Sequence, residues 1–272
     1  MDLVLDTPTS MLTATPEVLK ELGLTNAEAR VRALANLREA SPKRSFQSLG
    51  DGVWAARVGD SYDSSRVLLT QELARLPLKG EAVVVVANRG NVLVAGSEDP
   101  SGLAHLAGLA EQGMQQPRWI TGAALVYRDG VAHAWLPPAG HPSHAAFRYL
   151  AVGSRAELYR QQKELLEAVF EVEGVTVAVP AVGAIGDLRA AGVTLAILED
   201  LDNLVPQTDL VAFLVPDGEP ALVRWADFVG IAVPTPRPGL FPPRYDLSKA
   251  QLDAHRAALA AKSVDLAELK GL

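Results

Sequence analysis

Residues 59–66 bring together the side chains of this chain that are best suited to chemistry. They are those of Asp60, Tyr62, Asp63, Ser64, Ser65 and Arg66. If a helix begins here, its free N–H groups, the two serine hydroxyls and the guanidinium are donors of the kind that bind an anion such as phosphate. Asp60 and Asp63 oppose that role, because a carboxylate repels a nearby phosphate. The segment is therefore a candidate ligand-binding site.

Two structural interpretations of the same segment stay open. In the first, Asp63 is the N-cap of a helix and accepts a hydrogen bond from a backbone N–H of the first turn, while Tyr62 and Val67 form a hydrophobic staple. In the second, Asp60 holds the Arg66 guanidinium bidentately in an internal network. Because helix caps far outnumber active sites, we expect a structural role.

Catalysis by Ser64 or Ser65 would require a general base. The chain has no Gly-x-Ser-x-Gly elbow, and no histidine lies near these serines in sequence. His105 or His133 would have to reach them through the fold, which the sequence does not show. The sequence therefore gives no catalytic residue.

Three other groups of residues are weaker candidates. His141 and His144 have a spacing that would place both imidazoles on one helix face, but Pro142 favours a loop with surface histidines. Residues 183–187 hold only two of the three glycines of a dinucleotide-binding turn, so a plain turn is expected. The most acidic stretch contains Asp187, Glu199, Asp200, Asp202 and Asp209. It lacks the Gly and final Glu of a calcium loop, so we expect a solvated acidic loop, no metal and no cofactor.

Composition excludes several classes of protein. The chain has 272 residues, 49% of them hydrophobic, no cysteine and a formal net charge of −7. Disulfides and thiolate chemistry are excluded, and the acidic balance argues against nucleic-acid binding. The acidic N-terminus is unlike a signal peptide and no apolar run is long enough for a membrane span. We expect a cytoplasmic protein.

The elements that position residues 59–66 can be placed from local signals. Helices are predicted from Thr15-Pro16 and from the capping box Thr25–Glu28, a strand over 53–58, and a helix carrying Leu69, Leu73 and Leu76. Apolar runs on both sides of 88–91 and of Asp129-Gly130 predict two β-hairpins. This order predicts an α+β fold with antiparallel sheets and helices on one face.

The second half repeats some of this order. A helix is predicted over 155–169, and strands over 175–179, 193–198, 210–215 and 221–225. Residues 174–229 resemble 81–136 in element order, which would make two tandem similar units. We divide the chain into a flexible N-terminus (1–14), an α+β domain (15–137), a second α+β unit (150–232), and a Pro-rich strap with C-terminal helices (233–272).

Several segments resemble the YtpQ-type family, a group of bacterial proteins of unknown function. Tyr62-Asp63-Ser64-Ser65-Arg66 matches the family pattern Tyr-Asp-(Ala or Ser)-Ser-Arg at every place. Residues 24–38, the apolar hairpin 82–96 and the turn 125–130 complete the resemblance, which covers about residues 15–136. It implies a shared fold for this half and brings no activity with it.

The absence of a strong catalytic motif leads to the functional expectation. We expect a non-enzymatic protein-binding or interaction module, with sheet faces or edges and the Pro-rich strap open to a protein partner. The alternative is a hydrolase or phosphate-ligand-binding enzyme that uses residues 60–66.

Overall fold

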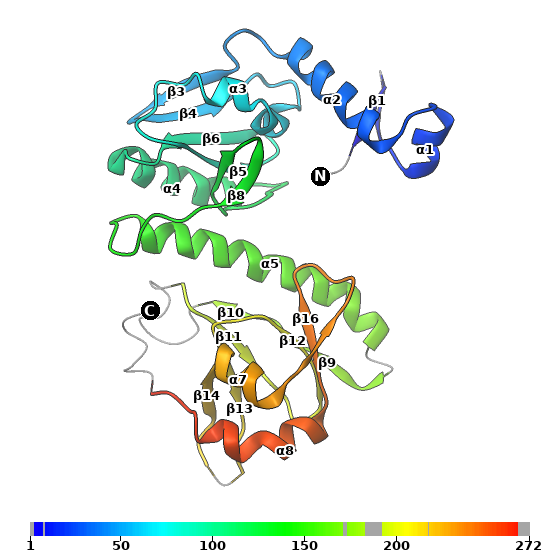
Figure 1. Cartoon of the computed structure of the whole chain (residues 1–272), viewed down its shortest axis with the longest axis vertical. Coiled ribbons are helices and arrows are strands. Elements are labelled where there is room, and N and C mark those ends of the chain that lie inside the picture. Colours follow the sequence, from blue (N-terminus) through cyan, green and yellow to red (C-terminus); the bar gives the residue numbers. More distant parts are fainter. Residues whose placement is uncertain (1–2, 8, 171–172, 183–191, 217, 266–272) are drawn as a thin grey trace. The chain divides into compact units, whose positions relative to one another are not determined.

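The chain folds into two compact units. A computed structural model describes residues 3–7, 9–170, 173–182, 192–216 and 218–265 (Figure 1). Unit 1 comprises residues 1–120 and 125–133, and unit 2 comprises residues 121–124 and 134–272. Both units combine helices with β-sheets, so the predicted α+β class is confirmed. Within the described ranges, no helix combines the length and the apolar character needed to cross a membrane.

Unit 1 consists of a small N-terminal part and a six-stranded sheet with its helices. Its elements are β1 (Val4–Asp6), β2 (Met11–Thr13), α1 (Pro16–Glu21), α2 (Asn26–Ala40), β3 (Phe46–Gly50), β4 (Val53–Ala56), the 3-10 helix η1 (Asp63–Leu68), α3 (Thr70–Leu73), β5 (Ala82–Asn88), β6 (Asn91–Gly96), α4 (Pro100–Met114), β7 (Leu125–Arg128) and β8 (Val131–Ala134). The predicted capping box forms at the start of α2, where Thr25 and Glu28 exchange hydrogen bonds. β1 and β2 pair antiparallel in the region for which we predicted no regular element.

The six-stranded sheet has the order β3-β4-β6-β5-β7-β8. Both predicted hairpins are present in it, β5–β6 and β7–β8. At the second turn Asp129 and Gly130 have φ values of 53° and 76°. These values suit the Asp-Gly turn expected there, because such turns require positive φ at both central residues. The sequence thus indicates the two hairpins locally, whereas the pairings of β4 with β6 and of β5 with β7 join strands farther apart in the chain.

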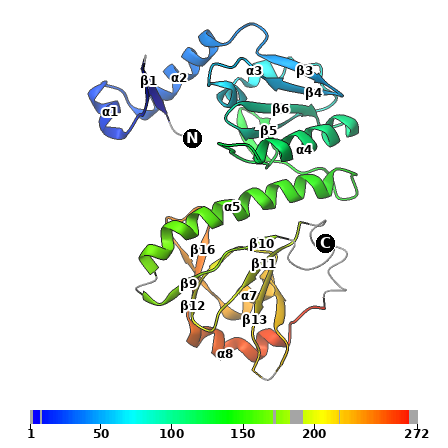
Figure 2. The ribbon, with the colours of Figure 1, turned by 180° about the vertical axis from the view of Figure 1, so that it is seen from behind.

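Helical segments cover both faces of this sheet, whereas the sequence led us to expect one face. Val84 and Val86 of β5 pack in one buried cluster with Val67 of η1 and the residues around α3. The alternate residue Ala87 faces α4 so closely that a Cβ at Gly113 would lie 2.6 Å from its Cβ. Figure 2 shows α4 running along the sheet. Successive side chains of β5 point to opposite faces of the sheet, and those on both faces are apolar. Each face therefore needs a covering layer of helical segments.

Unit 2 begins with a long helix and continues into two four-stranded sheets. Its elements are α5 (His144–Phe170), β9 (Val175–Val177), β10 (Ala181–Val182), β11 (Thr194–Ile197), β12 (Asp202–Pro206), β13 (Leu210–Phe213), β14 (Ala221–Arg224), α7 (Trp225–Ala232), β15 (Thr235–Arg237), β16 (Arg244–Leu247) and α8 (Lys249–Ala260). The predicted helix near 155–169 is longer and starts at His144. The Pro-rich strap is in fact an antiparallel pair, β15 with β16.

The sheets of unit 2 are mixed. Their orders are β10-β11-β13-β14 and β15-β16-β12-β9, and the pairs β11–β13 and β9–β12 are parallel. The main core combines apolar residues of these sheets with Phe228 of α7 and with Leu252 and Leu259 of α8, all buried. Because the six-stranded sheet of unit 1 is antiparallel and both four-stranded sheets of unit 2 are mixed, the predicted tandem repeat is not confirmed.

Candidate functional site

Arg66 is fully buried and two aspartates hold its guanidinium. Nη1 donates to Asp60 Oδ1 at 2.8 Å and Nη2 donates to Asp60 Oδ2 at 2.6 Å. Nη1 also donates to Asp63 Oδ1 at 3.2 Å, and Nε donates to the Ser41 hydroxyl at 3.1 Å. These four residues form what we call the Arg66 network. The bidentate arrangement is the internal-network interpretation made from the sequence, and it is confirmed.

Asp63 does not cap an α-helix, so that prediction is wrong. It is the first residue of the 3-10 helix η1, for which Tyr62 is the N-cap without a side-chain hydrogen bond. The Asp63 carboxylate instead accepts from the N–H groups of Val58 at 2.8 Å and Gly59 at 3.0 Å. These donors follow β4, so the carboxylate closes the end of the strand and, in the same place, binds the buried cation.

The electrostatics of the network favour a charged, closed pair. The hydrogen bond from Arg66 lowers the pKa of Asp60, and burial opposes this only in part. The same hydrogen bond raises the pKa of Arg66. Of the charged side chains in the network, Asp60 is the most exposed, at 30%, compared with 6% for Asp63 and 0% for Arg66. An approaching phosphate would therefore meet a carboxylate and not the guanidinium.

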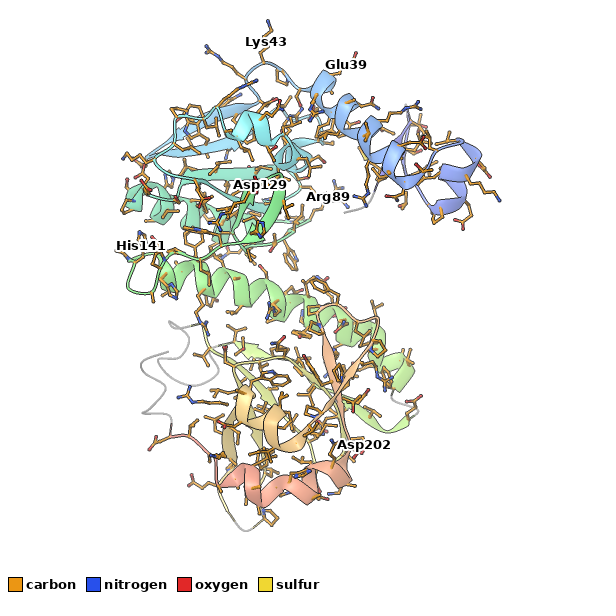
Figure 3. All side chains as sticks on the ribbon, in the orientation of Figure 1. Glu39, Lys43, Arg89, Asp129, His141 and Asp202 are labelled. Carbon is orange, nitrogen blue, oxygen red and sulfur yellow. The ribbon has the colours of Figure 1, made fainter. Side chains whose placement is uncertain are left out.

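The same segment connects distant parts of unit 1. The Tyr62 hydroxyl donates to the Asp6 carboxylate of β1, and this contact raises the pKa of Tyr62. The N–H of Ser64 donates to the carbonyl of Arg89, in the β5–β6 turn labelled in Figure 3, at 3.2 Å. Residues 60–66 therefore join β1, the end of α2, the end of β4 and the β5–β6 turn. Sequence reasoning did not find the contact with Asp6, which is 56 residues away.

The two serines are half-buried and have no described histidine beside them. His105 lies on α4 with its Nδ1 3.6 Å from the Asp51 carboxylate, and His133 is exposed on β8. In the part of the chain that the structure covers, neither imidazole is hydrogen-bonded to Ser64 or Ser65. Among the described residues, neither of these histidines is therefore placed to act as the base for a serine nucleophile.

The histidine pair at the start of α5 makes local hydrogen bonds. His141, labelled in Figure 3, accepts at Nδ1 from the Ser143 N–H at 3.1 Å. The Nδ1 of His144 lies 2.7 Å from the carbonyl oxygen of Pro137. The described residues contain no group of three side chains able to hold a metal ion. Both imidazoles thus organise the turn before α5.

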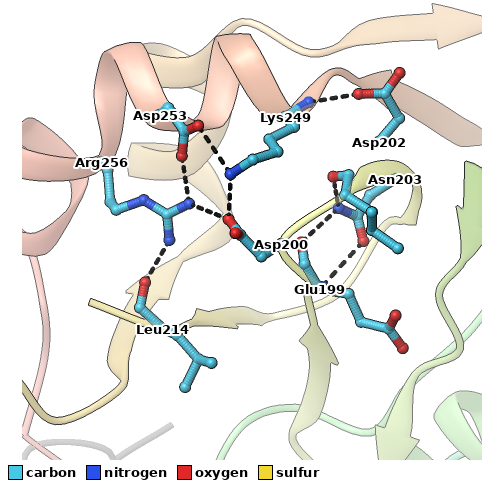
Figure 4. A network of polar contacts seen from close by, with 9 residues as sticks. Glu199, Asp200, Asp202, Asn203, Leu214, Lys249, Asp253 and Arg256 are labelled. Carbon is cyan, nitrogen blue, oxygen red and sulfur yellow. Dashed lines mark hydrogen bonds and ion pairs between the residues drawn. The ribbon is translucent and has the colours of Figure 1, made fainter. Parts of the chain in front are cut away.

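The acidic residues 199–202 are exposed in the β11–β12 turn, as expected for a solvated loop, and the structure adds a network of ion pairs with α8 (Figure 4). Asp200 accepts from Lys249 Nζ at 2.7 Å and from Arg256 Nη2 at 2.9 Å. Asp253 binds the same two cations. Lysine and arginine thus occupy the places beside these carboxylates where a metal cation would bind. Their ion pairs hold α8 against the β11–β12 turn.

The other members of the acidic stretch also have protein partners. The Asn203 amide donates to the carbonyls of Glu199 and Leu201, and Asp202 accepts from the Lys249 N–H at 2.7 Å. Asp209 binds the N–H and hydroxyl of Thr194. Asp187 and the turn predicted over 183–187 lie outside the described residues.

Arg244 of β16 is a second fully buried arginine, and the sequence did not point to it. Its four hydrogen bonds go to uncharged acceptors: Gln162 Oε1 at 2.5 Å and the carbonyls of Ala178, Leu204 and Tyr159 at 2.6, 3.1 and 3.1 Å. Burial lowers its pKa to about 10, so it remains charged at neutral pH. The side chain fastens β16 to α5 and β12.

The N-terminal part of unit 1 exposes apolar residues. All six residues of β1 and β2 are exposed, including Val4, Leu5, Met11 and Leu12. Next to them, a groove of about 440 Å³ is lined by Pro16, Leu19, Leu24 and neighbouring residues of α1 and the α1–α2 turn. Sequence reasoning missed this surface, because three-residue strands carry too little periodicity to be recognised.

Comparisons with known proteins identify no relative. No protein-family model, curated protein or solved structure matched the chain. The resemblance of residues 15–136 to the YtpQ-type family stays a prediction, and the function is inferred from the geometry alone.

Proposed function

We propose that this chain is a non-enzymatic protein-binding module and that an extended apolar segment of a protein partner binds at the β1–β2 hairpin. The observation that carries the proposal is the exposure of four large apolar side chains on six strand residues: 51% for Val4, 38% for Leu5, 48% for Met11 and 50% for Leu12. A two-stranded hairpin is only marginally stable in water, and clustered exposed apolar residues mark interaction sites.

The register of the hairpin defines the chemistry of the partner. Leu5 lies opposite Leu12, so these two side chains share one face. Asp6 lies on the other face, where Tyr62 holds it. The outer edges of β1 and β2 have no strand partner among the described residues. A third strand with apolar side chains at alternate positions would pair with such an edge and cover the leucines.

The adjoining groove extends the apolar surface. It begins at Ala14, directly after β2, and continues along α1 to Leu24. Leu22, at the end of α1, is 50% exposed. A partner segment that leaves the hairpin therefore meets further apolar surface.

The Arg66 network supports binding over the alternative of a hydrolase or phosphate-ligand-binding enzyme. Arg66 is fully buried and already paired, and no described histidine accompanies the serines. A thermal-shift screen with nucleotides, sugar phosphates and divalent cations tests that alternative. A stabilising ligand whose effect is abolished by Ser64→Ala or Ser65→Ala would favour the enzyme.

Site-specific crosslinking in the native host tests the proposal. A photoreactive residue at Leu12 is expected to capture a partner that the same residue at exposed Glu39 of α2 does not capture. With the purified partner, Leu12→Asp should weaken binding by about tenfold or more, since central apolar contacts dominate such interfaces. The matched control is Leu165→Asp, which changes a 75% exposed leucine of unit 2 and should leave affinity unchanged. Equal affinity of Leu12→Asp and wild type would contradict the proposal.

A further inference from the structure

A hollow of about 380 Å³ lies in unit 1 beside α3, and we call it the α3 hollow. Its apolar wall consists of Leu73, Ala74, Leu76, Leu78 and Ala82. The last three pack against the same buried cluster as β5 and β6 but remain only partly buried themselves. The volume falls within the range of pockets that hold small molecules, and the lining combines this apolar wall with polar groups.

Two hydroxyl groups in the lining have no protein partner. Thr70 and Tyr127 both line the hollow and are both partly buried. Among the described residues, neither side chain has a hydrogen-bond partner. A phenol and an alcohol beside an apolar wall are the few polar groups that fix the orientation of a ligand in such a pocket.

The charges at the rim are balanced. Glu81 lines the hollow, and its carboxylate accepts two hydrogen bonds from Arg128, Nε to Oε1 at 3.0 Å and Nη2 to Oε2 at 2.9 Å. The bidentate pair leaves no net charge for a ligand to neutralise. The site is therefore suited to an uncharged molecule.

From the volume, the apolar wall and the two unpartnered hydroxyls, we propose that the α3 hollow binds a small uncharged molecule with an aliphatic body and one hydroxyl or carbonyl end. The aliphatic part lies against Leu73, Leu76 and Leu78. The polar end exchanges hydrogen bonds with Tyr127 and Thr70. This site is separate from the hairpin surface, so it holds or fails independently of the proposed protein binding.

The Arg66 network lies directly before this site in the chain. Arg66 belongs to η1, whose last residue is followed at once by Leu69 and α3. Leu69 is 3% exposed and its N–H donates to the carbonyl of Arg66 at 3.0 Å. Residues 60–66, the polar segment noted in the sequence, are thereby connected to α3, which forms one wall of the hollow.

NMR titration of the ¹⁵N-labelled full chain with straight-chain primary alcohols from butanol to octanol tests the proposal. We expect saturable amide shifts around residues 70–82 and 125–130. Tyr127→Phe should weaken binding roughly fivefold, the loss of one ordinary hydrogen bond. Because its hydroxyl has no partner in the free protein, this variant should fold normally. Tyr149→Phe, a partly buried tyrosine of unit 2, is the matched control.

A second variant tests the cavity without touching the polar groups. Ala74 is exposed at the end of α3, so Ala74→Trp should fold and should block the hollow, whereas Ala104→Trp on exposed α4 surface should not affect binding. Absence of saturable shifts with every alcohol, or unchanged affinity in both Tyr127→Phe and Ala74→Trp, would overturn the proposal. Tighter binding of hexylammonium or hexanoate than of 1-hexanol would overturn the assignment of an uncharged ligand.

Discussion

Asp60 and Arg66 form a parallel two-bond pair in which solvent reaches the carboxylate but not the guanidinium, with exposures of 30% and 0%. They are six residues apart in sequence, yet the pair fixes more than its own loop. Through Asp63 and Ser41 the same guanidinium reaches the end of β4 and the end of α2. The structure of this part of unit 1 therefore depends on one buried cation.

Replacement of Arg66 should destabilise unit 1. Arg66→Ala leaves two carboxylates without their cation, and loss of one partner from a buried pair costs about 3 kcal/mol or more. Arg66→Lys should cost less but not be neutral, because an ammonium cannot bridge both oxygens as the planar fork does. Urea unfolding with hydrogen exchange read at the amides of β4 to β6 measures the effect. Arg57→Ala, an exposed arginine after β4, should change stability by under about 0.5 kcal/mol.

Acid should weaken this pair in a defined direction. The pKa of Asp60 is below its ordinary value of 3.8 in the folded state because Arg66 donates to it. The stabilisation is therefore fully present above pH 3.8 and is lost as the pH falls through the lowered value. The stability difference between wild type and Asp60→Asn should be large at about pH 6 and shrink at about pH 3. Asp129→Asn at the β7–β8 turn is the control, and a pH-independent difference for Asp60→Asn would contradict the prediction.

Tyr62→Phe should release the N-terminal hairpin without unfolding the sheet. It removes the hydroxyl that donates to Asp6 and leaves the ring in place. Amides of β1 and β2 should exchange faster with solvent, while those of β5 and β6 keep their protection. The hydrogen bond to Asp6 raises the pKa of Tyr62 above its ordinary value of 10.0. The stabilisation from this contact should therefore be fully present below pH 10.0 and be lost as the pH rises through the raised pKa of Tyr62. Unchanged amide hydrogen exchange in β1 and β2 would show that the Tyr62–Asp6 contact does not stabilise the hairpin.

Arg244→Lys should destabilise unit 2. A lysine has three donors on one nitrogen and cannot serve Gln162 and three carbonyl groups at separate positions. Two or more buried acceptors lose their donor, which should cost at least about 2 kcal/mol. Hydrogen exchange of β12 and α5 in the intact chain measures the loss, and Arg155→Lys on the exposed side of α5 provides the comparison. Equal protection in both variants would contradict the role assigned to Arg244.

Local signals predicted those parts of the fold in which partners are close in sequence. The Thr25–Glu28 capping box and the Asp129-Gly130 turn form as expected, since each depends on residues within one turn. The Pro-rich strap was harder to interpret, because proline suggests irregular chain. Pro236 is accommodated in β15, which is an edge strand and leaves its missing N–H without consequence. Helix α7 was not predicted, and only its first residue, Trp225, fell within the strand expected over 221–225.

In the candidate sites, too, a contact could be predicted only where its residues lie close together in the sequence. The pairing of Arg66 with Asp60 was foreseen as one interpretation because both belong to one loop. The partners of Asp200 were not, since Lys249 and Arg256 follow it by 49 and 56 residues. Likewise, nothing near Arg244 indicates that it would turn inward, as its acceptors precede it by 40 to 85 residues.

The position of Arg244 late in the chain sets an order of events during synthesis. The carbonyl groups of Tyr159, Ala178 and Leu204 leave the ribosome 40 to 85 residues before Arg244, which donates their hydrogen bonds. By contrast, the contacts of Arg66 are complete once the first 66 residues have emerged. Unit 1 can therefore acquire its buried cation while translation continues, whereas unit 2 can acquire its own only after residue 244 has left the ribosome.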